Sequence, residues 1–394
     1  MKPVFKHSCL PDDAQTGMSA PCSLLIIAGE DSGDMHAANV IRELKKRRDD
    51  ISFWGIGGDK LRAEGVELLH HTGEMDVMGF VEVVKRYPFF KRVLNETVRE
   101  AEKRKPAAAL LVDYPGFNIR LARELKKRGV KILYYICPQV WAWHRGRIPK
   151  MAEIIDRLMV IFPFEVDVFN DVDLTVNFVG HPMVNELRQF RTAPAEILPW
   201  HGGKKIALLP GSRKQEISHI LPALLETARL LKSKYSDVSF IIPVPERRIE
   251  LVREILRAGK YAPAHIEVTA GNAREVLKQA DAALVASGTA TLEAALLRCP
   301  TILVFKTGAL NFALFKMVIR IPWIGIANII AGREMMPERI QHRMIPQDLA
   351  EQVARLMEQT PERTAMLNDF DALEHMLGAG NPAVAVAEII NLEL

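Results

Sequence analysis

The sequence predicts an α/β protein with two successive doubly wound, Rossmann-like units. Short apolar runs alternate with amphipathic segments of helical period along most of the 394 residues, and this alternation is typical of parallel sheets covered by helices. It pauses once, over residues 186–204, where prolines and glycines interrupt any period and indicate a linker. The length also suits two domains better than one core.

Each expected strand is a short apolar run that precedes a helical or loop segment. In the first unit these runs lie at 24–29, 51–58, 108–116, 131–138, 157–162 and 176–181. In the second unit they lie at 205–211, 238–244, 266–271, 282–287 and 301–306. The predicted parts are a loose tail (1–22), a first domain (23–185), a second domain (200–361) and C-terminal helices (about 362–394) that pack back on the first domain.

The composition is that of an ordinary globular protein. A net charge of +4 among 100 charged side chains favours anionic small substrates or an anionic membrane surface over nucleic acid. The four cysteines form no C-x-x-C pair, so we expect the protein to lie in a reducing cytoplasm, without disulfides. Residues 1–22 lack the apolar core of a signal peptide. The apolar stretch 307–332 is interrupted by Lys316, Arg320 and Pro322, so it is not a transmembrane helix, although it could lie against a membrane.

The first strand-to-helix turn, within LLIIAGEDSGDMHAANVIREL, carries the carboxylates Glu30, Asp31 and Asp34. Such turns usually hold phosphate, but these acids would repel a diphosphate and the glycine spacing is not G-x-G-x-x-G. We therefore interpret the turn as facing sugar hydroxyls. The alternative is structural: Asp31, Ser32 or Asp34 caps the helix.

Two turns of the second unit suit an anionic ligand better than the acidic turn of the first unit does. LLPGSRKQEI places Ser212 and Arg213 between a strand and a helix, which suits a diphosphate. In ASGTATLEAAL, Thr289 opens a helix and Glu293 lies one turn in, where its carboxylate could accept ribose hydroxyls. The alternatives are a capped turn with a solvated arginine and a glutamate that merely favours the helix dipole.

In the first unit Asp113 ends a strand, where ligands collect in open α/β sheets. It could act as a general base or be an ordinary turn residue. The segment with Trp141, His144 and Arg147 mixes aromatic and basic side chains, and packing beside an anionic ligand explains it better than nucleic acid does. The histidines and the Asp-x-Asp at 171–173 lack metal-site spacing.

Taken together, these segments resemble the lipid-A-disaccharide synthase family, glycosyltransferases of the GT-B type, whose two domains face each other across a cleft. The resemblance rests on motifs that keep their order over about residues 24 to 350: AGEDSGD, VMGFVEVVKR, VDYPGFNIRLA, VWAWHRGRI, FPFE, FVGHP, LLPGSRKQEI, ASGTATLEAAL and NIIAGRE. This chain departs from the family pattern at Gly116, His144, Lys306 and Ala327.

The resemblance implies an inverting transfer. The 6-hydroxyl of 2,3-diacylglucosamine 1-phosphate would attack the anomeric carbon of UDP-2,3-diacylglucosamine, giving a β-1,6 disaccharide and UDP. It implies neither metal nor other cofactor, and a peripheral position on the inner face of the cytoplasmic membrane. The oligomeric state stays open, with a homodimer among the possibilities.

The expected site residues fall into three groups. The base is expected to be Asp113, with Glu30, Asp34 and His144 as competitors. The residues expected at the UDP donor are Ser212, Arg213, Thr289, Glu293 and Asn328. Those expected at the acceptor or facing lipid are Ser32, Met78, Phe80, Trp141 and Arg147.

Two rival functions remain at this point. A UDP-sugar 2-epimerase would share the fold but would need no lipid-facing surface, and the apolar stretches 80–94 and 307–332 argue against it. A non-catalytic nucleotide-sugar-binding protein would not need Asp113. The stretches themselves could also be core helices with basic residues on a solvated face.

Overall fold

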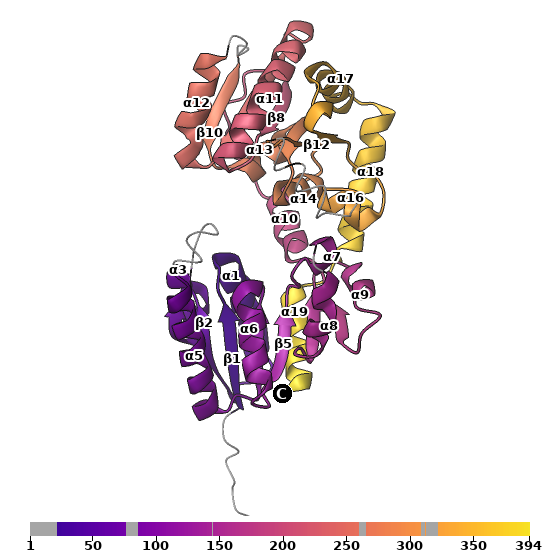
Figure 1. Cartoon of the computed structure of the whole chain (residues 1–394). Coiled ribbons are helices and arrows are strands. Elements are labelled where there is room, and N and C mark those ends of the chain that lie inside the picture. The colour runs from indigo at the N-terminus through magenta and orange to yellow at the C-terminus, as the bar shows by residue number, and fades with distance from the viewer. Residues whose placement is uncertain (1–21, 76–85, 144, 260–264, 309–311, 313–321) are drawn as a thin grey trace, which may run out of the picture. The chain divides into compact units, whose positions relative to one another are not determined.

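The structure is a computed structural model that describes residues 22–75, 86–143, 145–259, 265–308, 312 and 322–394 (Figure 1). The chain divides into two compact units, residues 1–132 with 390–394 and residues 133–389. No helix in the described part of the chain is long and apolar enough to cross a membrane. The domain boundaries expected from the sequence stay a prediction.

The strands form two sheets, and the strand pairings described are parallel. The seven-stranded sheet has the order β3-β2-β1-β4-β5-β6-β7. Its strands are β1 (Cys22–Ala28), β2 (Ile51–Gly57), β3 (Glu67–His71), β4 (Ala108–Val112), β5 (Lys131–Tyr135), β6 (Arg157–Val160) and β7 (Thr175–Phe178).

The six-stranded sheet has the order β10-β9-β8-β11-β12-β13. Its strands are β8 (Lys204–Leu209), β9 (Val238–Val244), β10 (Ile266–Ala270), β11 (Ala282–Ala286), β12 (Thr301–Phe305) and β13 (Glu338–Ile340). All the strands expected from the sequence are therefore confirmed, and β3 and β13 are additional. Central strands such as β4 and β11 are buried along their whole length, as parallel strands covered on both faces must be.

Helices follow most strands. In the first half of the chain they are α1 (Asp31–Lys45), α2 (Asp59–Ala63), α3 (Thr72–Met75), α5 (Tyr87–Arg104), α6 (Pro115–Lys126), α7 (Val140–Trp143), α8 (Ile148–Ala152), α9 (Glu165–Val168) and α10 (Pro182–Thr192). In the second half they are α11 (Lys214–Lys234), α12 (Ile249–Ala258), α13 (Ala273–Gln279), α14 (Thr289–Leu296), α16 (Ile326–Ala331), α17 (Pro346–Met357), α18 (Pro361–Met376) and α19 (Pro382–Glu393).

The C-terminal residues are helical, as expected. Helix α18 packs against α14 and α17, and its Phe370 and Leu373 belong to the hydrophobic core that covers the six-stranded sheet. The last turn of α19 instead contacts the seven-stranded sheet, because Lys131 at the start of β5 forms an ion pair with Glu393 at 3.1 Å.

The strand order reverses once in each sheet. In the seven-stranded sheet the chain runs from β1 outward to β3 and then returns to β4 on the other side of β1, and β8 and β11 flank the same reversal in the six-stranded sheet. At such a point neighbouring connections leave the sheet in opposite directions, and this opens a crevice at the carboxyl ends of the strands. The turns with Glu30, Asp113, Arg213 and Thr289 all follow these four strands.

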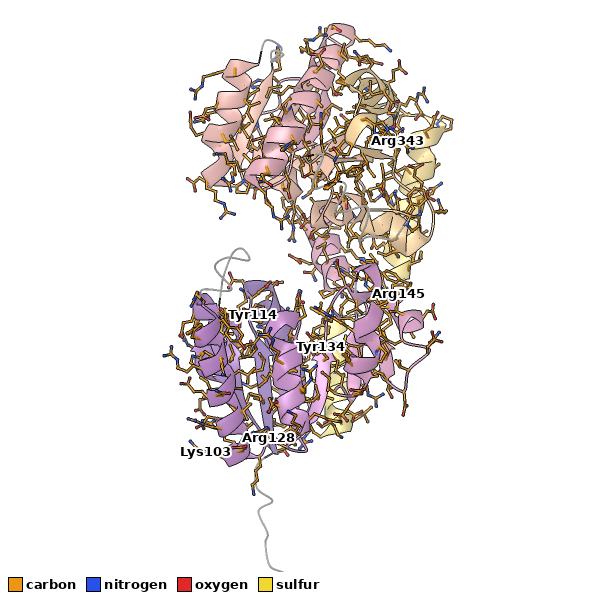
Figure 2. All side chains as sticks on the ribbon, in the orientation of Figure 1. Lys103, Tyr114, Arg128, Tyr134, Arg145 and Arg343 are labelled. Carbon is orange, nitrogen blue, oxygen red and sulfur yellow. The ribbon has the colours of Figure 1, made fainter. Side chains whose placement is uncertain are left out.

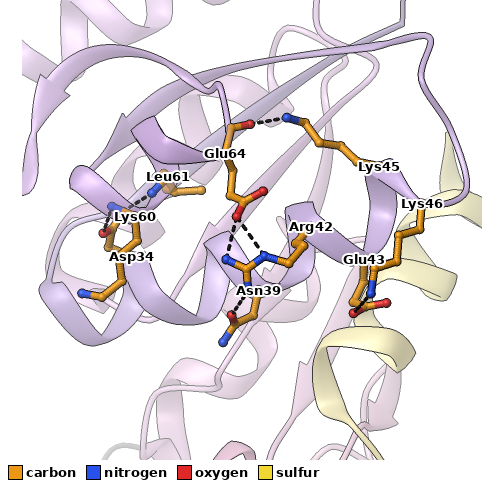
Figure 3. Close-up of polar contacts among 9 residues, drawn as sticks. All are labelled: Asp34, Asn39, Arg42, Glu43, Lys45, Lys46, Lys60, Leu61 and Glu64. Atoms are coloured by element: carbon orange, nitrogen blue, oxygen red, sulfur yellow. Dashed lines mark hydrogen bonds and ion pairs between the residues drawn. The ribbon is translucent and has the colours of Figure 1, made fainter.

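Asp34 fastens the first of these turns to the neighbouring helix (Figure 3). It is 2% exposed, and its carboxylate accepts hydrogen bonds from the backbone N–H groups of Gly58, Lys60 and Leu61 at 2.6, 3.1 and 3.2 Å. Asp34 thus caps α2, whereas Glu30 begins α1 without a side-chain cap. The structural alternative, in which Asp31, Ser32 or Asp34 caps α1, is wrong: the start of α1 has no side-chain cap, and Asp34 is directed at α2.

We predict that Asp34→Asn lowers the free energy of unfolding by about 1–3 kcal/mol, because an amide cannot replace a buried carboxylate that accepts three backbone hydrogen bonds. Chemical denaturation followed by circular dichroism measures this. Asp31→Asn is the matched control, since Asp31 is an exposed acid of the same helical turn. Equal stability of the two variants would contradict the role assigned to Asp34.

Candidate functional site

Asp113 lies in an unusual backbone turn at the end of β4. Asp113 and Tyr114 both adopt left-handed conformations, with φ of 46° and 47°, before α6 begins at Pro115. Asn118 holds this turn, because its side-chain amide donates to the carbonyl oxygens of Val112 and Asp113 at 3.2 and 2.8 Å. Consecutive left-handed residues other than glycine are strained, and such strain is found mainly at functional sites.

Tyr114 completes the turn by packing across the switch point. A Cβ atom at position 29 would overlap the Tyr114 ring, so glycine is required there. The Tyr114 hydroxyl donates to the carbonyl oxygen of Met75 at 3.0 Å. The turn after β1 and the turn after β4 are therefore in direct contact, and they bring Glu30 and Asp113 together.

The charge of Glu30 acts on the Asp113 carboxyl group. Burial, and then the negative charge of Glu30, raise the pKa of Asp113 from its usual 3.8 to about 6, against the opposing effect of a backbone hydrogen bond from Tyr114. Glu30 itself is exposed. A carboxylate with this pKa is ionised at neutral pH and is a stronger base than an ordinary aspartate.

The other residues expected near the acceptor have varied positions. Ser32 is exposed in the first turn of α1, and Arg147 is exposed in the short 3₁₀ helix 145–147. Met78, Phe80 and His144 lie outside the described residues. Trp141 is only 6% exposed, and its indole N–H donates to Glu165 Oε1 at 3.1 Å.

Glu165 is a functional candidate that the sequence did not single out, although its segment FPFE was noted. It is 1% exposed, and its second oxygen accepts from the N–H of Phe162 at 3.1 Å. Burial raises its pKa to about 7, against the opposing effect of its hydrogen bonds. The available signal was an acid directly after Phe162-Pro163-Phe164, but its partner Trp141 is distant in sequence.

The turn after β8 has its own internal anion. Gly211 is left-handed (φ 103°), and Glu216 Oε2 accepts from the N–H groups of Ser212 and Arg213 at 3.2 Å each. Glu216 Oε1 pairs with the Arg213 guanidinium at 3.1 Å, although the Arg213 side chain is 84% exposed. The residues that open this turn, Ser212 and Arg213, are not acidic, but the Glu216 carboxylate folds back and binds their N–H groups.

The turn after β11 presents Thr289 and Glu293 on one face of α14. Thr289 is exposed at the first position of the helix, and the side chain of Glu293 is 15% exposed. Glu293 Oε1 accepts from Arg274 Nε at 2.8 Å. Because β8 and β11 are paired neighbours, the Arg213 turn and the Thr289 turn lie at the same edge of the sheet.

Asn328 is buried within a polar network. Its amide donates to the Met336 carbonyl and to Glu338 Oε1, both at 2.9 Å, and its oxygen accepts from the N–H groups of Met335 and Met336. Glu338 also accepts from the N–H groups of Ile324 and Gly325, just before α16. Asn328 thus fixes the segment that it lies in, and its side chain is not exposed for a ligand.

A groove of about 870 Å³ runs between α5 and α6. Its lining includes the apolar side chains of Tyr87, Phe90, Leu94, Val98 and Phe117. Basic side chains border it, namely Lys91, Arg99, Arg120, Arg123 and Arg128. Figure 2 shows two lining residues, Tyr114 and Arg128, at opposite ends of α6. We call this feature the α5–α6 groove.

The charges of the groove do not cancel. Its two acids, Glu102 and Glu124, both pair with Arg128, at 2.6 and 3.1 Å. Among the described residues, no carboxylate pairs with the four remaining basic side chains of the lining. The groove therefore combines an apolar lining with a net positive border.

Comparison with known proteins identifies relatives over nearly the whole chain. The model of the family described as lipid-A-disaccharide synthetase matches residues 24–388. Lipid-A-disaccharide synthase from Myxococcus xanthus is 36% identical over 381 residues, which are 96% of this chain and 98% of that protein. The Anaeromyxobacter dehalogenans enzyme of the same name is 37% identical, over 93% of this chain and 96% of its own.

Solved structures resemble the fold with little sequence identity. A putative UDP-N-acetylglucosamine 2-epimerase from Listeria monocytogenes has a TM-score of 0.63 at 13% identity, covering 94% of this chain and 95% of its own. The glycosyltransferase of kitacinnamycin has a TM-score of 0.60 at 15% identity, covering 95% and 99%. These likenesses show the GT-B type of fold, and they do not favour an epimerase over a transferase.

We predict a pH-dependent effect of Asp113→Asn on stability. Because the folded-state pKa of Asp113 is raised, protonated Asp113 stabilises the fold fully below about pH 4, and this contribution is lost as the pH rises through about 6. The variant should therefore gain stability relative to the parent protein between these pH values and keep that gain above them. Thermal unfolding at several pH values, with Asp31→Asn as control, measures this. A difference independent of pH would contradict it.

Proposed function

Because the chain belongs to the lipid-A-disaccharide synthase family of glycosyltransferases, we propose that it joins two acylated glucosamines. The donor is UDP-2,3-diacylglucosamine and the acceptor is 2,3-diacylglucosamine 1-phosphate. The acceptor 6-hydroxyl oxygen forms a bond to the donor's anomeric carbon, the bond from that carbon to the diphosphate oxygen breaks, and UDP leaves. The products are the β-1,6-linked disaccharide 1-phosphate and UDP.

The observation that carries the proposal is the contrast between the two switch points. One presents two neighbouring acids, Glu30 and Asp113, one of which has a raised pKa. The other presents an exposed arginine at the start of a long helix, together with the start of α14. The first can accept a proton from a hydroxyl, and the second suits a departing diphosphate.

We assign the donor to the edge that carries Ser212, Arg213, Thr289 and Glu293. The Arg213 guanidinium and the N-termini of α11 and α14 offset the negative charge that develops on UDP. To bind the diphosphate, Arg213 must exchange its pairing with Glu216 for phosphate oxygens. Asn328 supports this edge from within, through the network that holds α16.

We assign general-base catalysis to Asp113. Its raised pKa suits proton abstraction near neutral pH, and its position at the carboxyl end of β4 lies at the crevice. Asp34 is unsuited, because backbone N–H groups already occupy its carboxylate. Glu30 is the competitor, since it is exposed at the same turn; in our assignment its charge raises the basicity of Asp113.

The acyl chains call for a lipid-facing surface, and the α5–α6 groove supports one. Tyr87, at the start of α5, is 52% exposed although it is a large aromatic residue, and Arg86 stacks on Phe89 with 4.7 Å between the guanidinium carbon and the ring centroid. Apolar surface beside a border of basic side chains is the pattern of peripheral binding to an anionic membrane. We propose that this face contacts the membrane that supplies both substrates.

We predict that Asp113→Asn lowers kcat by about 10²–10⁴-fold, the usual cost of losing a general base, while the dissociation constant of UDP changes little. Release of UDP from the two lipid substrates measures turnover, and calorimetry measures UDP binding. Glu30→Gln is the matched variant, and it should retain more activity. If Asp113→Asn keeps more than about a tenth of the activity, above that range, while Glu30→Gln abolishes it, the base is Glu30.

We predict that reversing three charges of the groove, in Lys91→Glu/Arg99→Glu/Arg120→Glu, weakens binding to anionic vesicles by roughly two orders of magnitude, at about 1 kcal/mol for each basic residue near the surface. Flotation with vesicles of mixed neutral and anionic phospholipid measures this. Lys60→Glu/Arg253→Glu/Arg355→Glu is the control, since these residues are exposed and lie outside the groove. An equal loss of vesicle binding in both variants would show that binding depends on the net charge of the protein and not on the groove.

A further inference from the structure

Arg274 connects two carboxylates that belong to different helices. Its Nε donates to Glu293 Oε1 at 2.8 Å, and its Nη1 donates to Glu186 Oε1 on α10. Arg274 occupies the first turn of α13, just after Gly271 and Asn272, which are both left-handed with φ of 70° and 59°. These two residues turn the chain sharply out of the edge strand β10, and the turn starts α13 where Arg274 can reach α14.

The pairing leaves one oxygen of Glu293 for a ligand. Within the described residues, Oε1 is bonded to Arg274, and no protein donor is bonded to Oε2. Glu293 lies four residues beyond Thr289, so both side chains lie on one face of α14. With a side chain 15% exposed, Glu293 is largely withdrawn from water but remains accessible.

A largely buried carboxylate needs a hydrogen-bonded partner to hold it in one orientation. Withdrawing a charge from water is costly unless it is paired and hydrogen-bonded. The planar guanidinium supplies fixed donors, and Glu186 holds its other side. Burial lowers the pKa of Arg274, but the hydrogen bonds and charges of Glu186 and Glu293 outweigh this and raise it.

We infer that Arg274 is a positioning residue of the donor site: it orients the Glu293 side chain so that the second carboxylate oxygen accepts hydrogen bonds from the ribose hydroxyls of the nucleotide. The inference rests on the proposed function, because that proposal places the donor nucleotide beside Glu293. It adds a residue that is distant from Glu293 in the sequence and belongs to no turn at the switch point. Arg274 acts only through Glu293 and does not touch the nucleotide.

The test compares UDP with 2′,3′-dideoxy-UDP, which lacks both ribose hydroxyls. Calorimetry gives the dissociation constant of each nucleotide for the parent protein, Glu293→Gln, Arg274→Gln, Arg274→Lys and the control Arg253→Gln. Arg253 is exposed on α12, outside the donor site. The ratio of the two constants reports the hydroxyl contacts alone, so a general loss of stability cancels.

We expect the parent protein and Arg253→Gln to prefer UDP by about tenfold or more, as hydrogen bonds to a charged group typically give. Arg274→Gln should reduce this preference to below about threefold by weakening UDP alone, and Arg274→Lys should restore part of it, because lysine supplies charge without the planar fork.

Other outcomes separate the inference from the proposal that it rests on. Suppose that Glu293→Gln abolishes the preference for UDP over 2′,3′-dideoxy-UDP. The inference is then overturned if Arg274→Gln keeps the full preference, or if it weakens the binding of both nucleotides equally. An unchanged preference in Glu293→Gln, or none in the parent protein, shows instead that Glu293 does not contact the ribose, and then the donor assignment and the inference both fail.

Discussion

A parallel sheet directs the carboxyl ends of all its strands to one edge, and the candidate sites depend on this constraint. Where the strand order reverses, β1 and β4 in one sheet and β8 and β11 in the other deliver their turns side by side. Glu30 and Asp113 are distant in the sequence, yet the pairing of Ala28 with Val112 fixes them as neighbours. The sheet, more than any single motif, creates the electrostatic coupling between them.

Three carboxylates of this protein have different surroundings. The carboxylate of Asp34 is saturated by backbone N–H groups and fastens two helices. That of Glu165 is buried with an indole partner and has a pKa of about 7. That of Asp113 has a second acid beside it. The residue type is therefore a poor guide to role, because the partners and the burial decide whether a carboxylate is structural or reactive.

Apolar runs and turn chemistry were sufficient to predict the fold. Strands β3 and β13 were not predicted. The sequence of β3, ELLHH, is only partly buried, and β13 has three residues, so neither makes a long apolar run. The turns with Asp113, Arg213 and Thr289 were also predictable. Their partners were not: Gly58 for Asp34, Trp141 for Glu165 and Arg274 for Glu293 depend on how helices pack, which no local pattern encodes.

The left-handed turn at Asp113 also matters for engineering. Asparagine tolerates this backbone conformation well and carries no charge that burial would penalise. A screen that selects only heat resistance would therefore favour Asp113→Asn, a substitution that removes the proposed base. Attempts to stabilise this protein should also measure the activity of variants at position 113, because a substitution that raises stability there is expected to lower activity.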